Sequence, residues 1–506
     1  MAPDLKGNLM KRQAGRSTIH RVVFGAAVGL MMAGGGGPSD AQGTAAQASG
    51  EAPAAGSSRA ERIESGLLAP IQLKGVEPER MSLAERMAHY EVKGLSVAII
   101  DDFEIVWTQG FGVVQGGTEE PVTPTTIFQA GSISKPVATL VALRLVAAGQ
   151  LALDDPVNDR LTSWKLPDSE AGGPEPVRIR DLLTHSAGLA PFIFAAVPAT
   201  EERPPLPELL DGQGTPGVTR AEPRGRRFLY SNPAFGVLQQ LLVDVGGKPF
   251  DQIARKEVFD PLGMKSSSFA SVLPPPLFEL ASYGHDQQGE PIPGKGLVVP
   301  GAVGGLWTTP TDLCLFLLGL FEANHDEGDF LPRVLANGMV TRQFEDRGFG
   351  TEIAASGEAR RAFHGGGLPG FVAFMVGYPD TGQGAVVMVN SGGWSLMHEI
   401  LRAVAVEYDW PGFVVEREVV AMAPEAFARF AGRYELEVRP DVKPSITTRS
   451  GRFYYGKWEM LPVSDTMFVI PDLGTQIEFV IESTGRANSC FFGEPGTSRI
   501  RLRRIE

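Results

Sequence analysis

The sequence predicts an α+β protein in which helices flank one antiparallel sheet and a small all-β domain follows. Two observations predict the sheet: strand-like runs occur near both ends of a long stretch of helical periodicity, and strands from both ends of a domain can close a single sheet. The runs are 95–100, 104–114, 371–378 and 384–390. Short alternating segments separated by Gly, Pro and Asp predict the second domain. We expect a large domain over 61–412 and a β-barrel-like domain over 420–506.

Residues 1–41 have the layout of an export signal. Five Lys and Arg residues precede an apolar run over 22–33, and small residues follow it up to Ala41. The run is shorter than the roughly 20 residues that a membrane-spanning helix needs, so a cleavable signal peptide is favoured over a retained anchor. Residues 42–60 are mainly Ala, Gly, Ser and Pro and predict a flexible leader. We therefore expect a periplasmic or secreted protein without a stable membrane anchor.

Hydrophobic spacing predicts the elements of the large domain in order. A helix over 81–90 leads into the first two strands, which the turn Asp101-Asp102 joins as a hairpin. Apolar residues at helical spacing predict four further helices. They cover 136–148, 234–245, 311–321 and 395–406. The proline-rich segment 191–218 is predicted to be a loop. In the last domain, the segments with strand spacing are 452–458, 466–470 and 476–481.

Composition limits the partners and cofactors of the chain. Its 506 residues include 59 acidic and 46 basic ones, a formal net charge of −13, which argues against nucleic acid as a partner. The seven histidines lack the spacing of a metal site, so no metal or other cofactor is expected. Two cysteines, Cys314 and Cys490, do not make a disulfide framework. They are expected to be separate buried thiols, with a bridge between them as the alternative.

A serine and a lysine three residues apart form the strongest local feature, in Gly131-Ser-Ile-Ser-Lys135 at the start of a predicted helix. This spacing places both side chains on one helix face, where an unprotonated Lys135 can take the proton of Ser132. Free N–H groups at the helix N-terminus would also favour developing negative charge. Taken alone, the pattern favours the alternative of a helix-capping serine and a solvated lysine, so the other segments must decide.

The segment Tyr230-Ser-Asn232 stands just before the helix predicted over 234–245. Tyr230 could share a proton shuttle with Lys135. The amide of Asn232 could hold a substrate amide while contacting the lysine. The alternative is a buried tyrosine with Asn232 capping the helix.

The segment His364-Gly365-Gly366-Gly367 leads into a predicted strand. Its glycines let a ligand approach the backbone closely, and an N–H beside them could form an oxyanion hole with that of Ser132. His364 could then orient or protonate the substrate. The alternative is a glycine-rich turn with an incidental histidine.

In this order, Ser132-x-x-Lys135, Tyr230-x-Asn232 and His364-Gly-Gly resemble the three motifs of the serine beta-lactamase and D,D-peptidase superfamily. The resemblance is to its class C-like branch, which holds class C beta-lactamases, D,D-carboxypeptidases, D-aminopeptidases and esterases. Flanking segments are also similar to those of the branch. They are Ile179–Leu189, Asp260–Met264 and Gly304–Asp312.

The resemblance covers about residues 80–408 and implies a role for each motif residue. Ser132 would be the nucleophile, Lys135 its base, and Tyr230 the proton donor and acceptor. The oxyanion hole would consist of the backbone N–H groups of Ser132 and Gly367. The substrate would be bound by Asn232, His364, Gly365 and Gly366. It also implies a beta-lactamase/transpeptidase-like sheet covered by helices, beside a helical subdomain, with the site at their junction. His185, in a segment typical of the branch, is expected to hold its turn by hydrogen bonds.

One position departs from the class C beta-lactamases, which have lysine where this chain has His364. Histidine there resembles the peptidase and esterase members, so efficient beta-lactam hydrolysis is not expected. The C-terminal domain resembles the lipocalin-like barrels of some peptidase relatives. We expect an exported serine peptidase or amidase acting on small peptides, including ones with D-residues. The alternatives are a carboxylesterase with the same machinery, a beta-lactamase, and a non-catalytic penicillin- or peptidoglycan-binding protein.

Overall fold

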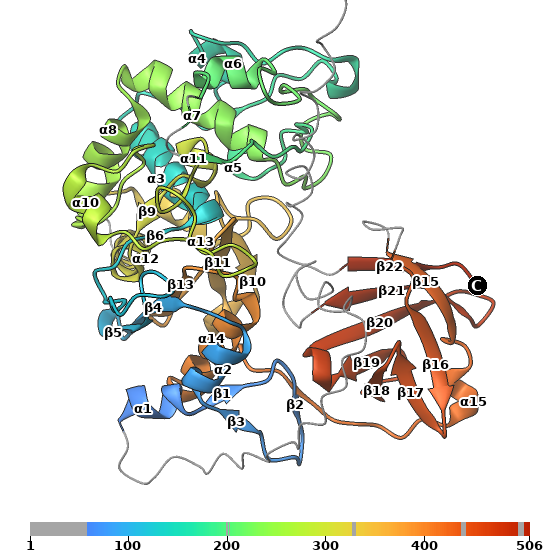
Figure 1. Ribbon diagram of the computed structural model, residues 1–506. Helices are drawn as coiled ribbons and strands as arrows, with labels where there is room; N and C mark the ends of the chain where they lie inside the picture. Colours follow the sequence, from blue (N-terminus) through green and yellow to red (C-terminus); the bar gives the residue numbers. More distant parts are fainter. Residues whose placement is uncertain (1–57, 199–200, 202, 326–329, 437–441, 494–499) are drawn as a thin grey trace, which may run out of the picture.

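The structure is a computed structural model that contains an α+β body and a separate barrel (Figure 1). It describes residues 58–198, 201, 203–325, 330–436, 442–493 and 500–506. The predicted signal peptide and most of the predicted leader lie outside the described residues.

A six-stranded antiparallel sheet forms the centre of the body. In spatial order its strands are β10 (Glu352–Ala354), β11 (Arg361–Leu368), β12 (Phe371–Tyr378), β13 (Gln383–Val389), β4 (Gly94–Asp101) and β5 (Glu104–Gly112). Because β13 pairs with β4, with Val386 opposite Ala98, the N-terminal hairpin and the C-terminal strands close one sheet. The predicted α+β arrangement is therefore confirmed.

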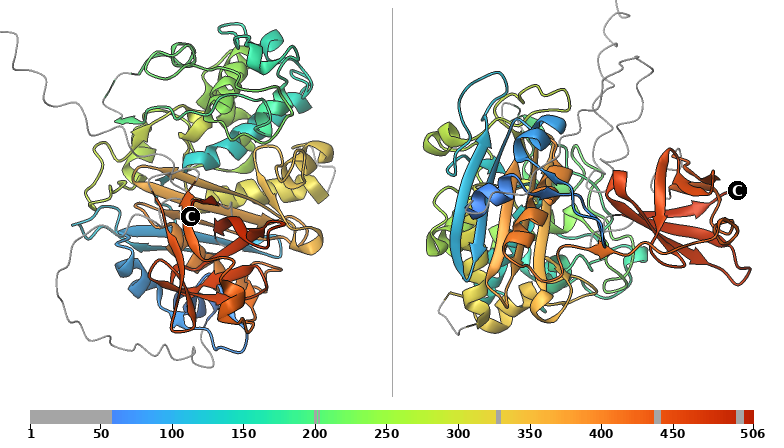
Figure 2. Two further views of the ribbon diagram at one scale, coloured as in Figure 1. Left: turned by 90° about the vertical axis from the view of Figure 1, so that its right-hand side faces the viewer. Right: turned by 90° about the horizontal axis from the view of Figure 1, so that it is seen from below.

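Helices cover both faces of this sheet (Figure 2). Alternate residues of β4 point to opposite faces, so Ala98 and Ile100 join the core on one side while Val97 and Ile99 join the core on the other. The first core includes residues of α3 (Ser134–Ala147) and α12 (Pro310–His325), and the second includes residues of α14 (Trp394–Glu407). Burial on both faces explains why β4 reads as a continuous apolar run.

Two arginines connect the N-terminal helices to α14. Arg62 of α1 (Arg59–Glu64) is ion-paired with Glu407, and Arg86 of α2 (Leu83–His89) donates to Glu399 at 2.8 and 2.7 Å. These contacts hold the N-terminal segment on the outer face of the sheet.

A helical subdomain packs beside the sheet, with α3 and α11 (Gly301–Gly304) at the junction (Figure 1). The other helices of this middle region are α4 (Val157–Arg160), α5 (Ile179–Leu183), α6 (Leu206–Leu210), α7 (Asn232–Gly246), α8 (Phe250–Ala254), α9 (Asp260–Leu262), α10 (Pro275–Leu280) and α13 (Arg333–Val340). The segment 191–218, predicted as a loop, contains α6 and the short strand β7 (Val197–Pro198). Pro198 is the last residue of β7, and Pro205 and Pro207 stand at the N-terminus of α6, where proline is tolerated.

The C-terminal region is a closed eight-stranded antiparallel barrel, as predicted. Its strands are β15 (Gly432–Leu436), β16 (Ser445–Arg449), β17 (Arg452–Tyr455), β18 (Trp458–Pro462), β19 (Met467–Ile470), β20 (Thr475–Ile481), β21 (Ala487–Gly493) and β22 (Ile500–Arg504). The predicted single strand 452–458 is wrong, because Gly456 at φ +60° turns the chain between β17 and β18. Aromatic side chains fill the interior, where Phe427 of α15 (Pro424–Phe427) stacks on Phe453 at 4.1 Å.

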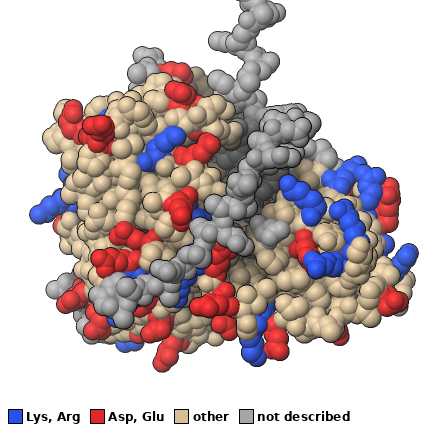
Figure 3. Space-filling view, turned by 60° about the horizontal axis from the view of Figure 1, so that its bottom comes forward, with Lys and Arg blue, Asp and Glu red and all other residues tan. Residues whose placement is uncertain are grey.

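Short contacts join the barrel to the body. Strand β14 (Glu416–Arg417) pairs in parallel with β2 (Gln72–Leu73), and Arg417 donates to Gln476 of the barrel at 3.2 Å. The remaining short strands pair as β1 (Leu67–Leu68) with β3 (Arg80–Met81), β6 (Phe128–Gln129) with β9 (Trp307–Thr308), and β7 with β8 (Leu297–Val298). Figure 3 shows acidic side chains scattered over the body and several Lys and Arg side chains close together on the barrel.

Candidate active site

Ser132 lies on a tight turn that becomes α3. The turn is one 3₁₀ unit, Gly131–Ile133, and α3 continues from Ser134. Gly131 has φ +52°, and a Cβ there would lie 2.5 Å from the backbone nitrogen of Gly367, so this close approach of β11 requires glycine. Ser132 is partly exposed between buried neighbours. Its hydroxyl is therefore held firmly but stays accessible to a substrate.

The side chain of Lys135 is fully buried beneath Ser132. Its Nζ donates to Ser132 Oγ at 2.9 Å and to the carbonyl oxygen of Val303 in α11 at 2.7 Å. No carboxylate within the described ranges forms an ion pair with it. Burial without a counter-charge lowers the pKa of Lys135 to about 7. Near neutral pH, a substantial fraction of this amine is unprotonated and can accept the serine proton.

Tyr230 approaches the same oxygen from the segment just before α7. Its hydroxyl donates to Ser132 Oγ at 3.0 Å, and its ring centroid lies 5.1 Å from Lys135 Nζ. Desolvation raises the pKa of Tyr230 above its usual value, although the hydrogen bond to Ser132 acts in the opposite direction. The phenol is therefore a proton donor at neutral pH. Ser231 fixes its position, because the Ser231 side chain caps α7 by accepting from Ala234 N–H at 3.3 Å.

The glycines of the third motif lie on β11, beside the serine turn. A Cβ at Gly366 would lie 1.9 Å from Ala130 O and 3.1 Å from Ser132 N, so the backbone of β11 rests directly on this turn. Strand β10 pairs with β11 only up to Phe363, which leaves the next residues of that edge without a strand partner in the described structure. Counting from the hairpin pair Leu368 and Phe371, the alternation of an antiparallel ladder points the N–H of Gly367 to this edge.

Comparison with known protein families shows which family has this arrangement of serine, lysine and tyrosine motifs. The beta-lactamase family model matches residues 82–408, which include all three motifs. The chain belongs to the beta-lactamase family. It is therefore a serine hydrolase of the beta-lactamase kind, and the resemblance expected from its motifs is confirmed.

The similar proteins include more than one kind of member of this family. Penicillin-binding protein 4* of Bacillus subtilis is 24% identical over 75% of this chain and 88% of its own length. Esterase EstB of Burkholderia gladioli is 31% identical over 39% of this chain and 52% of its own length. An octameric penicillin-binding protein homologue from Pyrococcus abyssi has a TM-score of 0.53 at 23% identity, covering 83% of this chain and 98% of its own. The last similarity supports the beta-lactamase/transpeptidase-like fold.

Asn232, the last residue of the Tyr-x-Asn motif, does not cap the helix as the alternative prediction expected. It is the first residue of α7, partly exposed, and Ser231 rather than Asn232 caps the helix. Its amide makes no hydrogen bond to the described residues, and Lys135 donates to Ser132 and Val303 instead. The predicted contact between Asn232 and the lysine is thus not a hydrogen bond in this structure. Its role as a substrate clamp stays a prediction.

His364 replaces the lysine that class C beta-lactamases have at this position. Its side chain is buried, and its Nδ1 lies 2.6 Å from the carbonyl oxygen of Gly365. Burial, assisted by the charge of Lys135, lowers the pKa of His364 to about 3. The imidazole is therefore neutral at physiological pH, with Nδ1–H donating to Gly365. It can orient a substrate by hydrogen bonding but supplies no positive charge.

His185 lies against Tyr230, a contact that the sequence did not predict. The two ring centroids are 4.4 Å apart, and Nδ1 of His185 accepts from Ser231 N–H at 3.1 Å. Its backbone N–H donates to Leu182 O within its turn, and its carbonyl oxygen accepts from Leu229 N–H, next to Tyr230. Burial holds the pKa of His185 well below its usual value. The histidine does hold its turn, and in addition it positions the phenol. Its place in a segment typical of the family was the only sequence signal.

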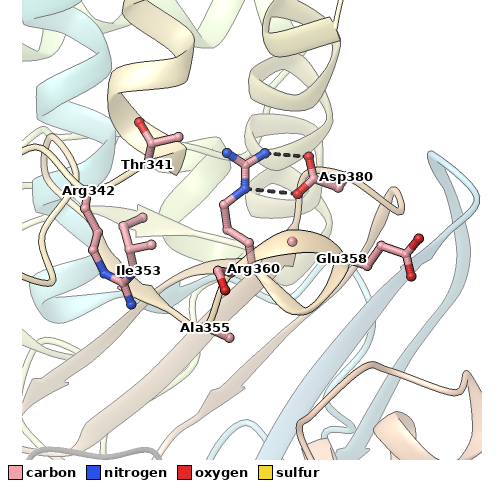
Figure 4. Close-up of a pocket in the computed structure, with 9 residues that line it drawn as sticks. Thr341, Arg342, Ile353, Ala355, Glu358, Arg360 and Asp380 are labelled. Carbon is pink, nitrogen blue, oxygen red and sulfur yellow. Dashed lines mark hydrogen bonds and ion pairs between the residues drawn. The ribbon is translucent and has the colours of Figure 1, made fainter.

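Two cavities differ in their relation to this site. A cavity of about 540 Å³ lies at the β10–β11 hairpin, and the Arg360–Asp380 ion pair borders it (Figure 4). No candidate catalytic residue lines it, so the reaction does not take place there. A second cavity, of about 10 Å³, borders Tyr230. Its lining residues are Leu183, His185, Tyr230, Arg347, Gly348, Gly350, Thr351, Glu352 and His364.

Other groups that the sequence singled out lie outside the site. Cys314 and Cys490 are separate, buried thiols, as predicted. Across the described residues, no three His, Cys, Asp or Glu side chains are arranged to hold a metal ion. The same part of the chain contains no helix with the length and hydrophobicity to span a membrane.

Proposed function

We propose that this serine hydrolase is an exported peptidase or amidase that forms an acyl-enzyme on Ser132. One observation carries the proposal: the amine of Lys135 and the phenol of Tyr230 both lie within hydrogen-bonding distance of Ser132 Oγ, at 2.9 and 3.0 Å. A buried amine with a lowered pKa and a protonated phenol are the base and the acid that acyl transfer needs.

Acylation follows from these positions. Neutral Lys135 takes the proton of Ser132 as Oγ attacks the carbonyl carbon, and the N–H groups of Ser132 and Gly367 hold the oxyanion. When the carbonyl carbon separates from the leaving nitrogen, Tyr230 donates its proton to that nitrogen. The proton on Lys135 then returns to the phenolate through the contacts that both groups share. In deacylation, water gives a proton to the same pair, attacks the acyl carbon, and Ser132 leaves with a proton.

Peptides are favoured as substrates by three features of the site. An amine is a poor leaving group, and protonated Tyr230 lies where it can donate to such a group. The unpaired edge of β11 beyond Phe363 can also accept an extended peptide as an added strand. Neutral His364 offers no permanent cation, which supports peptides over beta-lactams.

A carboxylesterase is the second candidate, because Esterase EstB is 31% identical to part of this chain. Esters need less protonation of the leaving group than amides. The two candidates therefore differ in how much of their rate depends on Tyr230.

The experiment is a substrate screen on the chain from residue 42 onwards. Its panel contains D- and L-aminoacyl anilides, short peptides, p-nitrophenyl esters and nitrocefin, with Ser132→Ala as the control. We expect turnover of amides and covalent labelling of Ser132 by a fluorophosphonate. Turnover confined to esters would overturn the peptidase assignment, and absence of labelling in folded protein would overturn the acyl-enzyme. Mass spectrometry of the protein from its native host tests export, with cleavage expected after about Ala41.

A further inference from the structure

A largely buried ion pair, formed by Arg347 and Glu352, lines the same small cavity as Tyr230 and belongs to none of the three motifs. Arg347 Nη1 lies 2.6 Å from Glu352 Oε2, and the arginine and glutamate side chains are 9% and 25% exposed. The two residues pair across the ends of the turn 347–352, where Glu352 is the first residue of β10. Asp346 also contacts this guanidinium, at 3.1 Å, but its side chain is 61% exposed and so is screened by water.

This turn is fastened to the segment that carries Tyr230. The N–H of Phe228 donates to Glu345 at 2.9 Å, and the guanidinium of Arg347 stacks over the Phe228 ring at 3.9 Å. The Phe228 and Tyr230 ring centroids are 6.5 Å apart. The turn can therefore influence both the position of the Tyr230 side chain and the electrostatic potential at its hydroxyl group.

The ion pair and the phenol border the same small cavity. His185 and His364 line it as well, and both are neutral because burial lowers their pKa values. Lys135 does not line this cavity, but its Nζ lies 5.1 Å from the centroid of the Tyr230 ring. Arg347 and Glu352 are thus the charged residues of that cavity lining. Both charges act on the phenol, and water screens such interactions less in a largely buried site than at the surface.

We propose that Arg347 and Glu352 are positioning residues that set the strength of Tyr230 as a proton donor. The positive charge of Arg347 favours the phenolate and makes Tyr230 a better acid. The negative charge of Glu352 holds the proton on the phenol and makes it a weaker one. This inference rests on the proposed function, since it assigns Tyr230 the protonation of the leaving group.

The dependence of the rate on leaving-group basicity tests it. We would measure kcat/KM for esters of one acyl group with p-nitrophenol and with an alkyl alcohol, in the full chain and its variants. The nitrophenolate needs no proton, whereas the alkoxide does. We expect Arg347→Met to lower turnover of the alkyl ester about tenfold more than that of the nitrophenyl ester. The ratio of kcat/KM for the alkyl ester to kcat/KM for the nitrophenyl ester therefore falls in Arg347→Met. In Glu352→Gln the same ratio should rise, by about threefold.

Matched controls separate this role from a structural one. Asp346→Asn removes an exposed carboxylate from the same guanidinium and should leave the ratio within about twofold. Arg347→Lys keeps the positive charge, so its ratio should be much closer to that of the natural chain than the ratio of Arg347→Met is. In a Tyr230→Phe background, Arg347→Met and Glu352→Gln should no longer change the ratio. The proposal would be overturned if Arg347→Met and Glu352→Gln both lowered the ratio. It would also be overturned if either substitution still changed the ratio in the Tyr230→Phe background.

Folding and the proposed function are checked independently. Each variant is labelled at Ser132 with a fluorophosphonate, which reports an intact nucleophile. If Arg347→Met fails to fold because Glu352 is left buried without a partner, the double variant Arg347→Met/Glu352→Gln removes both charges and should show a ratio close to that of the natural chain. A ratio like that of Glu352→Gln alone would count against the proposal. Loss of labelling in all proteins, the unaltered chain included, would instead refute the acyl-enzyme.

Discussion

The amine of Lys135 lies 2.9 Å from the hydroxyl oxygen of Ser132, in a place where it has no carboxylate partner among the described residues. Its second acceptor is the carbonyl oxygen of Val303. This arrangement makes the amine a base at the expense of stability, since burying a cation without a counter-charge is unfavourable.

Replacing Ser132 with alanine should abolish turnover and leave the fold intact. The side chain is partly exposed, and its loss removes one oxygen from the contacts of Lys135 and Tyr230. We expect no activity above background and a melting temperature within a few degrees of the natural chain. Full turnover in the variant would refute Ser132 as nucleophile.

The rate should depend on pH through Lys135. Because burial lowers the pKa of this amine to about 7, it is charged below that pH and cannot accept a proton. We expect kcat/KM to rise with pH and to be half-maximal near pH 7. Lys135→Arg, which stays charged, should lose at least about 10²-fold of kcat. An acid limb controlled by a carboxylate near pH 4 would contradict this assignment.

The same residue should limit stability. The ordinary lysine pKa of 10.5 applies in the unfolded chain, so at pH 7 folding must displace a proton or bury a charge. The difference corresponds to about 5 kcal/mol at most, part of which the hydrogen bonds already offset. The penalty is greatest below about pH 7 and disappears as pH approaches 10.5. Lys135→Met should therefore be inactive and more stable by up to a few kcal/mol in urea unfolding at pH 7, with a smaller gain at pH 9.

Gly366→Ala should inactivate the protein, because the added methyl group would lie 1.9 Å from Ala130 O and separate β11 from the serine turn. Gly392→Ala is the matched control, since nothing lies within 4 Å of a Cβ there. We expect a loss of at least about 10²-fold in kcat/KM for the first variant and little change for the second. Equal activities would refute the close approach of β11 to the serine.

His185 should affect kcat rather than substrate affinity. It packs on Tyr230 and accepts from Ser231 N–H, but does not contact Ser132. Asparagine tolerates the φ of +56° at this position, so His185→Asn isolates the loss of the ring. We expect kcat to fall about tenfold, with KM and the acid limb near pH 7 unchanged. A shift of that limb would show that His185 itself titrates in catalysis.

Local patterns predicted the regular elements well where burial and periodicity agree. Strand β12 has the predicted bounds, and the central strands and main helices differ from them by a few residues. Helix α7 begins two residues early because Pro233 is tolerated in the first turn of a helix. Short elements such as α5 contain too few residues for a periodic signal.

Some residues of the candidate site could likewise be predicted from the sequence, and others could not. The sequence by itself indicated Ser132, Lys135 and Tyr230, because their spacing relative to helix starts resembles motifs of a known family. It could not indicate Arg347 or Glu352, which lie more than 110 residues from Tyr230 in the chain and carry no local pattern.

What the sequence determined, then, is the set of elements and the identity of the reacting groups, since helix spacing, capping and turn formation depend on residues close together in the chain. Only the tertiary structure decided that Lys135 is buried without a counter-charge, that β11 rests on the serine turn, and that an ion pair lines the same cavity as the phenol. The pKa of a group depends on every charge and every solvent-excluding atom around it. Those neighbours come from distant segments that meet only when the chain folds.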